Sequence, residues 1–243
     1  MKIIDVNMSI GHKDYRGEWI TPEDMLALME EYHIDHAVCY HAQTWLDPKD
    51  GNRKMAEIAQ KSAGKIGLCV VLDPILGAEN LPGEGTLQQR LEALKPECLR
   101  VFPKMCRMPF HPFYFEEILN VANTLGLPLL IDEPYNMEFF CRLPEISRQY
   151  PNVKFILIEQ GMCEGRRIYP LATKCTNVYF TCERMADNLQ IEETEARNCC
   201  DKLLFGSGYP NRPHAGALGL VLYANISEEN REKILSKNWE AMV

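Results

Sequence analysis

The stretch PLLIDEPYNMEFFCRLPEISRQYPNVKFILI, residues 128–158, contains the unit from which the fold is predicted. Two short apolar runs, at residues 128–131 and 154–158, flank a segment in which Leu-Pro-Glu at 143–145 is a helix-start signal. Neither run alternates apolar with polar residues, which is typical of strands buried on both faces of a parallel sheet. The stretch therefore predicts a strand–helix–strand unit with its helix beginning near residue 143.

The same unit repeats along the whole chain. Eight apolar runs begin 24 to 34 residues apart, at residues 2–6, 36–40, 66–72, 98–102, 128–131, 154–158, 178–181 and 203–205. Helix signals lie between them, among them Thr21 followed by Pro22, and a helical pattern over residues 115–125 that Gly126 ends. Eight strands alternating with helices predict an α/β protein, a single (β/α)8 TIM-like barrel spanning residues 1–243.

An open, doubly wound sheet is the alternative fold for alternating strands and helices. Such sheets more often have about five or six strands. Neither nucleotide-binding fingerprint of that fold is present, because no G-x-G-x-x-G follows the first apolar run and no G-x-x-x-x-G-K-[ST] occurs. The sequence therefore favours the closed barrel.

Composition excludes several functional classes. The 243 residues are 46% hydrophobic and 25% charged, with a net charge of −8, as in an ordinary globular protein. A nucleic-acid-binding protein should carry a basic stripe, but no Lys/Arg run here is longer than two residues, and Arg166-Arg167 is most simply a solvated surface pair. The longest apolar runs fall far short of the roughly 20 residues that span a bilayer, and Asp5 interrupts the region where a signal peptide would be apolar. We expect a soluble, cytoplasmic protein that binds neither nucleic acid nor membranes.

The ten cysteines do not predict a metal site. No C-x-x-C spacing occurs, and paired C-x-x-C motifs are the strong signal for structural zinc. Several cysteines lie inside apolar runs, where a free thiol behaves as a small hydrophobic side chain. We expect reduced thiols in a cytosolic chain.

Polar residues accumulate where the predicted strands end. In a barrel the carboxyl ends of the strands form the active-site face. The polar residues at these ends, in chain order, are Asn7, Ser9, His41, Asp73, Arg100, Lys104, Asp132, Glu133, Glu159, Gln160, Glu183, Ser207 and Tyr209. This face is where we expect the functional site.

Several motifs resemble those of the amidohydrolase-related (amidohydrolase 2) barrels. The opening IDVNMS at 4–9 resembles the family's I-D-x-H-x-H, and LFGSGYP at 204–210 is very close to its L-F-G-S-D-Y-P. The fifth, sixth and seventh predicted strands are similar to the family's G-L-P-x-x-x-H, F-P-x-x-x-x-x-x-x-H and N-V-Y segments. The resemblance covers nearly the whole chain in the expected order and implies the same barrel, for which a homodimer would be unsurprising.

The resemblance fails at the metal ligands. In the family, four histidines and one aspartate hold a divalent metal that activates water. The residues at these places here are Asn7, Ser9, Asp132, Glu159 and Gly208. Zinc prefers imidazole and thiolate ligands, so we expect no metal and no cofactor. An oxygen-ligated Mg²⁺, Ca²⁺ or Mn²⁺ on Asp132 and Glu159 stays open as an alternative.

Asp132 and Glu159 are the candidate acid and base. They end neighbouring predicted strands about 5 Å apart, close enough for one carboxylate to raise the pKa of the other. Two similar groups can in this way become a general acid and a general base. The structural alternative is ion pairing with Arg100 or Lys104.

The remaining candidates serve substrate binding or proton transfer. Arg100 can grip a substrate carboxylate through two hydrogen bonds, or form a salt bridge to Asp132. His41 can shuttle protons near neutral pH, although a single histidine is more often structural. Asn7, Ser207 and Tyr209 are expected to bind substrate, and Ser207 also suits a hydrogen bond within its own turn.

Three functions follow from these residues. The first is metal-independent hydrolysis, of the lactone type, or lysis of a small carboxylated molecule; metal-free lactone hydrolases occur in the amidohydrolase superfamily. The second is a non-catalytic relative that binds a ligand or a partner protein, which the loss of all five ligand positions favours. The third is a rewired cation site with oxygen ligands. Buried acids and arginines are costly without a purpose, which favours the enzyme.

Overall fold

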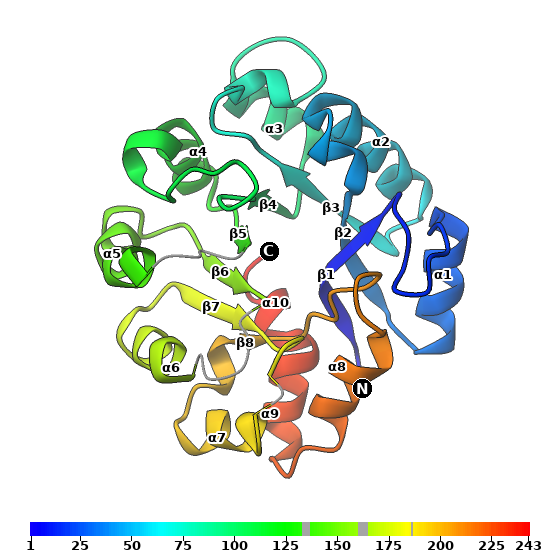
Figure 1. Cartoon of the computed structure of the whole chain (residues 1–243), viewed down its shortest axis with the longest axis vertical. Helices are drawn as coiled ribbons and strands as arrows, with labels where there is room; N and C mark the ends of the chain where they lie inside the picture. The colour runs from blue at the N-terminus through cyan, green and yellow to red at the C-terminus, as the bar shows by residue number, and fades with distance from the viewer. Residues whose placement is uncertain (133–136, 160–164, 186) are drawn as a thin grey trace.

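Eight parallel strands surrounded by helices make up the computed structural model, which describes residues 1–132, 137–159, 165–185 and 187–243 (Figure 1). Neighbours in the sheet follow the chain order. The strands are β1 (Ile4–Ile10), β2 (His36–His41), β3 (Ile66–Val71), β4 (Cys98–Val101), β5 (Leu129–Asp132), β6 (Phe155–Ile158), β7 (Val178–Thr181) and β8 (Leu203–Leu204). The predicted (β/α)8 barrel is confirmed.

Contacts between the first and last strands close the barrel. The backbone N–H of Val6 donates to the carbonyl of Phe205 at 3.0 Å, and Met8 forms a parallel bridge with Tyr209. The register of β1 against β2 shifts between Asp5 and Met8. This irregularity lets β1 continue to Ile10, beyond the predicted end at residue 6, so that Asn7 and Ser9 lie inside the strand.

Helices follow the strands, most of them around the outside of the barrel, whereas the last of them lies towards its centre (Figure 1). They are α1 (Pro22–Glu31), α2 (Pro48–Lys61), α3 (Leu87–Leu94), α4 (Pro112–Leu125), α5 (Met137–Gln149), α6 (Gly165–Lys174), α7 (Gln190–Ala196), α8 (His214–Leu222), α9 (Glu228–Glu232) and α10 (Asn238–Glu240). Short helical turns are η1 (Ala42–Trp45), η2 (Gly77–Asn80), η3 (Cys200–Lys202) and η4 (Lys233–Lys237). Two predicted boundaries hold: Thr21 and Asp24 form a capping box at α1, and Gly126 ends α4 at φ +68°.

Helix α5 begins earlier than the sequence predicts. The Leu-Pro-Glu signal at 143–145 was expected at the helix start, but the helix begins at Met137 and Pro144 lies inside it. Pro144 lacks an N–H and so removes one helical hydrogen bond. Phe139, Leu143 and Ile146 are buried in the core, and this apolar burial outweighs the local cost.

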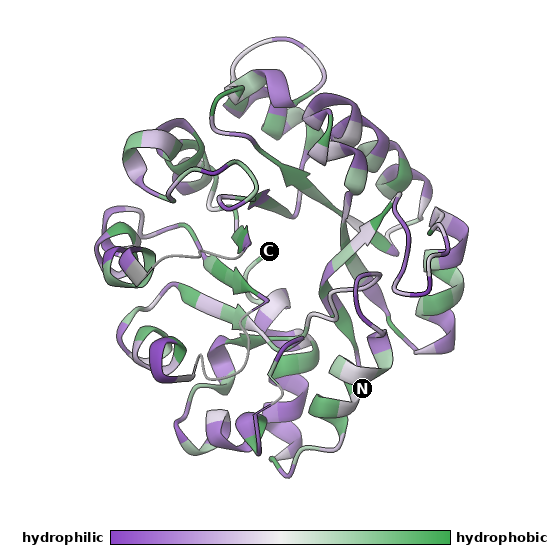
Figure 2. Ribbon diagram, viewed as in Figure 1, coloured by the Kyte–Doolittle hydropathy of each residue, from purple (hydrophilic) through white to green (hydrophobic). Residues whose placement is uncertain are grey.

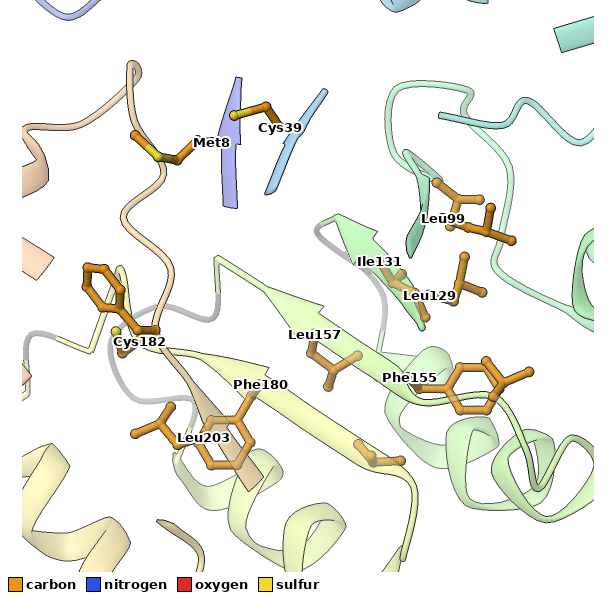
Figure 3. Close-up of a cluster of buried hydrophobic side chains, with 14 of the residues drawn as sticks. Met8, Cys39, Leu99, Leu129, Ile131, Phe155, Leu157, Phe180, Cys182 and Leu203 are labelled. Atoms are coloured by element: carbon orange, nitrogen blue, oxygen red, sulfur yellow. The ribbon is translucent and has the colours of Figure 1, made fainter. Parts of the chain in front are cut away.

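The alternation of side chains along the strands creates two apolar layers. One layer lies between strands and helices and includes Leu129, Ile131, Leu157 and Phe180 (Figure 3). The other fills the barrel interior; it includes Tyr40, Phe102, Leu130 and Ile158, with Trp239 of α10 joining it from the C-terminal segment. Because successive residues face opposite layers, Arg100 and Asp132 lie on the interior side, two positions from Cys98 and Leu130.

The hydropathy of the ribbon follows this layering. The strands are largely apolar, whereas the surrounding helices carry both polar and apolar residues (Figure 2). Among the described residues, no helix is both long and apolar enough to cross a membrane. The nine described cysteines are free thiols, and seven of them are buried.

Candidate active site

Arg100 lies at the centre of the polar cluster inside the barrel. Its side chain is 3% exposed; Nη1 donates to Asn7 Oδ1 at 2.8 Å and Nη2 to Asp132 Oδ1 at 2.6 Å. The guanidinium carbon lies 4.4 Å from the ring centre of Tyr40 and 5.0 Å from that of Phe102. Burial alone would lower the pKa of Arg100, but the carboxylate of Asp132 and other nearby groups raise it above its ordinary value. Arg100 is therefore a permanent cation that joins β1, β4 and β5.

Glu183, two residues after β7, is the hydrogen-bond hub of the cluster. Its Oε1 accepts from Asn7 Nδ2 at 2.8 Å, from the backbone N–H of Glu159 at 2.8 Å and from Thr181 Oγ1 at 2.9 Å. Its Oε2 is buried and has no hydrogen-bond partner in the described part of the chain. Burial, and secondarily the charge of Glu159, raises the pKa of Glu183 to about 7 in spite of these hydrogen bonds. Near neutral pH the carboxyl exchanges a proton, and Oε2 is the oxygen left to carry it.

Asn7 connects the cation to the buried acid. Its amide oxygen accepts from Arg100 and its amide nitrogen donates to Glu183. The backbone N–H of Asn7 donates to Asp5 Oδ1 at 3.0 Å, and its carbonyl accepts from Gly208 N at 3.0 Å. With both ends of the amide and its backbone engaged, the orientation of Asn7 is fixed.

Asp132 and Glu159 lie on adjacent strands, as the sequence predicts. Asp132 ends β5 and pairs in the sheet with Ile158, the residue before Glu159. Glu159 has φ +57°, so the chain leaves the regular strand there. The Asp132 side chain is 19% exposed and Glu159 is half-buried, while the charges of both act on Arg100. Asn7, Arg100, Asp132, Glu159 and Glu183 are called the Arg100–Glu183 cluster below.

His41 lies outside this cluster. Tyr40 faces the barrel interior, so His41 at the next position faces the opposite side. Its Nδ1 accepts from the backbone N–H of Gln43 at 3.0 Å, and its ring lies against Gly11. Burial lowers the pKa of His41, and Lys54 of α2 lowers it further. The histidine on the site side of β1 is instead His12, whose Nε2 is 2.8 Å from Ser9 Oγ.

Ser207 and Tyr209 shape the turn after β8. Ser207 Oγ accepts from the backbone N–H of Tyr209 at 3.1 Å, and Ser207 N donates to Asp5 Oδ1 at 3.1 Å. Both residues are buried. Burial, together with the charge of Asp14, raises the pKa of Tyr209 to about 12. These contacts agree with the predicted turn role of Ser207 and place both residues beside the cluster rather than within it.

Sequence reasoning assigned no role to Glu183, although it noted the residue at a strand end. The sequence instead favours Asp132 and Glu159, because they end neighbouring predicted strands close to each other. The signal that identifies Glu183 is its spacing from Thr181, because residues two apart share a face of a strand. The spacing alone does not show that Asn7 and Glu159 contact Glu183, and these contacts exist only in the folded chain.

The donor set at the family's metal positions does not fit a divalent cation. Oxygens of Asn7 and Asp132 point at the Arg100 guanidinium, and Ser9 is bonded to His12. A metal ion here would meet a buried positive charge. The described residues contain no group of three or more His, Cys, Asp or Glu side chains able to hold a metal ion.

Comparison with known proteins places this barrel among amidohydrolases. The amidohydrolase family model Amidohydro_2 matches residues 7–242. None of the curated proteins matches the sequence. Solved structures with the same fold include an uncharacterized TIM-barrel protein from Bordetella bronchiseptica, with 17% identity and a TM-score of 0.77 over 100% of this chain and 98% of that chain.

Two further similar structures are decarboxylases. The 2,6-dihydroxybenzoate decarboxylase from Rhizobium shares 13% identity at a TM-score of 0.73, over 100% of this chain and 98% of that chain. A dihydroxybenzoic acid decarboxylase from Polaromonas sp. JS666, with bound manganese and the inhibitor 2-nitroresorcinol, shares 14% identity at a TM-score of 0.74, over 99% and 96%. At these identities the likeness shows a common fold.

Proposed function

This chain belongs to the amidohydrolase family, and from that premise we propose that it is a metal-independent hydrolase or lyase acting on a small carboxylated molecule. The observation that carries the proposal is the buried Glu183 carboxyl, whose pKa is raised to about 7 beside a second carboxyl, that of Glu159. Two carboxyl groups whose environments differ in this way supply an acid and a base at one pH. The similarity in fold to two decarboxylases of hydroxybenzoic acids adds support for a carboxylated substrate.

In this proposal Glu159 and Glu183 divide the proton transfers. For a lactone, Glu159 removes a proton from water, whose oxygen attacks the carbonyl carbon. The ring C–O bond then breaks, and protonated Glu183 donates its proton to the departing oxygen. The half-buried position of Glu159 suits the base, and the unpartnered Oε2 of Glu183 suits the acid.

Arg100 acts in this scheme as a positioning residue. Both of its Nη atoms are bonded to Asn7 and Asp132, so its role is to hold these side chains rather than the substrate. Arg212 is better placed for a substrate carboxylate. It is half-buried in the loop after β8, and its Cδ is 3.5 Å from the position that a Cβ on Gly208 would occupy. Gly208 therefore lies next to this arginine, and its φ of +70° is a conformation that favours glycine.

Metal independence is part of the proposal. The Arg100 guanidinium supplies at this end of the barrel the positive charge that a divalent ion supplies in metal-dependent hydrolases. The guanidinium is held by side-chain oxygens of Asn7 and Asp132, and an oxygen-ligated cation would need these oxygens as ligands. The Mg²⁺, Ca²⁺ or Mn²⁺ site on Asp132 and Glu159 would therefore have to displace an ion pair.

The test is a substrate screen with and without chelator. Proton release from small carboxylated lactones, and loss of the carboxylate from hydroxybenzoates, should reveal turnover that EDTA leaves unchanged. Glu183→Gln should reduce kcat by about 10² or more, as loss of a general acid does. Glu84→Gln, a change of an exposed loop glutamate, is the matched control. Turnover that depends on added metal would refute the proposal.

A non-catalytic ligand-binding protein is the second candidate. It is favoured by the hydrogen bonds that Arg100 donates to Asn7 and Asp132, because a network in which polar side chains satisfy one another is typical of a structural role. This candidate is distinguished by ligands that bind without being converted. Binding of a carboxylate that Arg212→Gln weakens, with no product formed in any reaction of the screen, would support it over the enzyme.

A further inference from the structure

A second site lies on the outside of the barrel, between α5 and α6. These helices are neighbours in the ring around the sheet (Figure 1). The groove between them has a volume of about 410 Å³, within the range of small-molecule pockets. Its apolar lining is formed by Phe140, Pro144, Pro170 and Leu171. None of the residues known to line it belongs to the Arg100–Glu183 cluster.

The groove is rich in positive charge. Arg148, Arg166, Arg167 and Lys174 line it, and the described part of its lining contains no Asp or Glu. This contrasts with the chain as a whole, whose net charge is −8. Several cations elsewhere on the helices are paired with acids, for example Arg197 with Glu193 at 2.6 Å.

Three of these cations are available to a ligand. Arg148, Arg166 and Lys174 are exposed and form no ion pair or hydrogen bond with side chains of the described residues. The Arg167 guanidinium lies 4.8 Å from the ring centre of Phe140, which extends the cationic edge over the apolar floor. Unpaired surface cations alone are ordinary, but their convergence on an apolar concave surface whose described lining contains no acid is the signature of an anion site.

We infer that this groove binds a small amphipathic anion. An aromatic or aliphatic body would pack on Phe140, Pro144 and Leu171, and a phosphate, sulfonate or carboxylate head would bind the cations at the rim. The chemistry requires both parts of the ligand. Neither a free inorganic anion nor a neutral aromatic molecule satisfies both the charged rim and the apolar floor.

Phenyl phosphate is the probe, followed by ¹⁵N–¹H NMR titration of the intact protein. Amide signals of α5 and α6 should shift with saturation, at an affinity on the order of 1 mM expected for so small a ligand. Inorganic phosphate, benzoate and phenol are the comparison arms, which separate the head group from the ring. Phenyl phosphate should bind more tightly than inorganic phosphate and phenol, and benzoate shows whether a carboxylate head suffices.

The variant Arg148→Gln/Lys174→Gln should weaken binding of phenyl phosphate about tenfold or more. Arg53→Gln/Lys54→Gln on α2 removes the same charge elsewhere and should leave the affinity unchanged. Exposed Cys141, which also lines the groove, gives an independent readout, because bound phenyl phosphate should slow its alkylation by iodoacetamide. Equal affinities in the two double variants, shifts confined to the barrel end, or an unprotected Cys141 would each overturn the inference.

Discussion

Glu183 couples the stability of the protein to pH. Its pKa is raised from 4.5 to about 7 in the folded state, so the folded chain holds this proton more tightly than the unfolded chain. The contribution of Glu183 to the free energy of unfolding is therefore fully present below pH ~4.5 and is lost as the pH rises towards 7. The full loss is about 3 kcal/mol, taking each pKa unit as about 1.4 kcal/mol.

Glu183→Gln should remove this dependence, because glutamine keeps the shape of the protonated acid. The difference in unfolding free energy, variant minus wild type, should increase by about 1–3 kcal/mol from pH 5 to pH 8. Urea unfolding at both values measures the difference, and the other titrating groups cancel in the comparison. The exposed loop variant Glu84→Gln should show no such gain; a flat difference for Glu183→Gln would mean that the buried carboxyl is not proton-linked.

Arg100 should be the most costly charge to remove from the site. Arg100→Met leaves the oxygens of Asn7 and Asp132 without their cation in a buried setting, and we expect a loss of about 3 kcal/mol in unfolding free energy. Arg53→Met removes an exposed arginine with two acidic partners and should cost less than about 1 kcal/mol.

A double variant separates the lost charge from the lost packing. If the buried Asp132 charge causes the destabilisation, Arg100→Met/Asp132→Leu should recover part of it in the same denaturation experiment. Equal losses in the single and double variants would assign the cost to contacts with Tyr40 and Phe102 instead.

At the residue scale, strand-end reasoning found most of the cluster. Asn7, Arg100, Asp132, Glu159 and Ser207 are predicted to converge, because parallel strands place their carboxyl ends on one face. Hydrogen bonds join Arg100 to Asn7 and Asp132 and the backbone of Glu159 to Glu183, while the backbone N–H of Ser207 donates to Asp5 beside them. His41 was expected there as well, but alternation places it on the face opposite Tyr40. A difference of one residue along a strand moves a side chain from one face of the sheet to the other, and strand ends predicted from sequence are not accurate to one residue.

Two glycines should respond in opposite ways to alanine. Gly126 ends α4 at φ +68°, a conformation that a side chain disfavours by about 1 kcal/mol. Gly216 is exposed in the first turns of α8, and a Cβ there would meet nothing within 4 Å. Thermal unfolding should show a lower Tm for Gly126→Ala. For Gly216→Ala it should show a slightly higher Tm, which corresponds to a gain in stability of about 0.5 kcal/mol. Shifts of the same sign would contradict the conformational argument.

At the element scale, the sequence predicted every strand but not every boundary. Burial on both faces produces continuous apolar runs, and these are visible without the structure. The start of α5 and the extension of β1 were missed, since each depends on contacts elsewhere in the chain. Pro144 is tolerated because Leu143 and Ile146 are buried, and β1 reaches Ile10 because its pairing with β2 resumes at Met8 after the register shift that follows Asp5.

At the scale of the whole molecule, the residues inside the barrel, rather than the fold itself, carry the chemistry that we propose. The family likeness could be predicted from motifs along the chain, but the network centred on Arg100 could not. It joins Arg100 of β4 to Asp132 of β5 and to Asn7 of β1, residues separated by 32 and 93 positions. Such contacts exist only once the barrel closes.

The purified protein should contain no zinc in the barrel. Side-chain oxygens of Asn7 and Asp132 accept hydrogen bonds from the Arg100 guanidinium, and a zinc ion bound to these oxygens would have to displace that buried cation. Elemental analysis of protein grown with added zinc should give well below one zinc per chain, and activity should survive EDTA. Glu159→Gln should instead lower activity by about 10² or more, as loss of the general base does, whereas Asp132→Asn removes the charge that pairs with Arg100. About one zinc per chain, lost together with activity on chelation, would restore a metallohydrolase mechanism. One Mg²⁺, Mn²⁺ or Ca²⁺, retained by wild type and lost in both carboxylate variants, would point to an oxygen-ligated cation site in which Arg100 has moved aside.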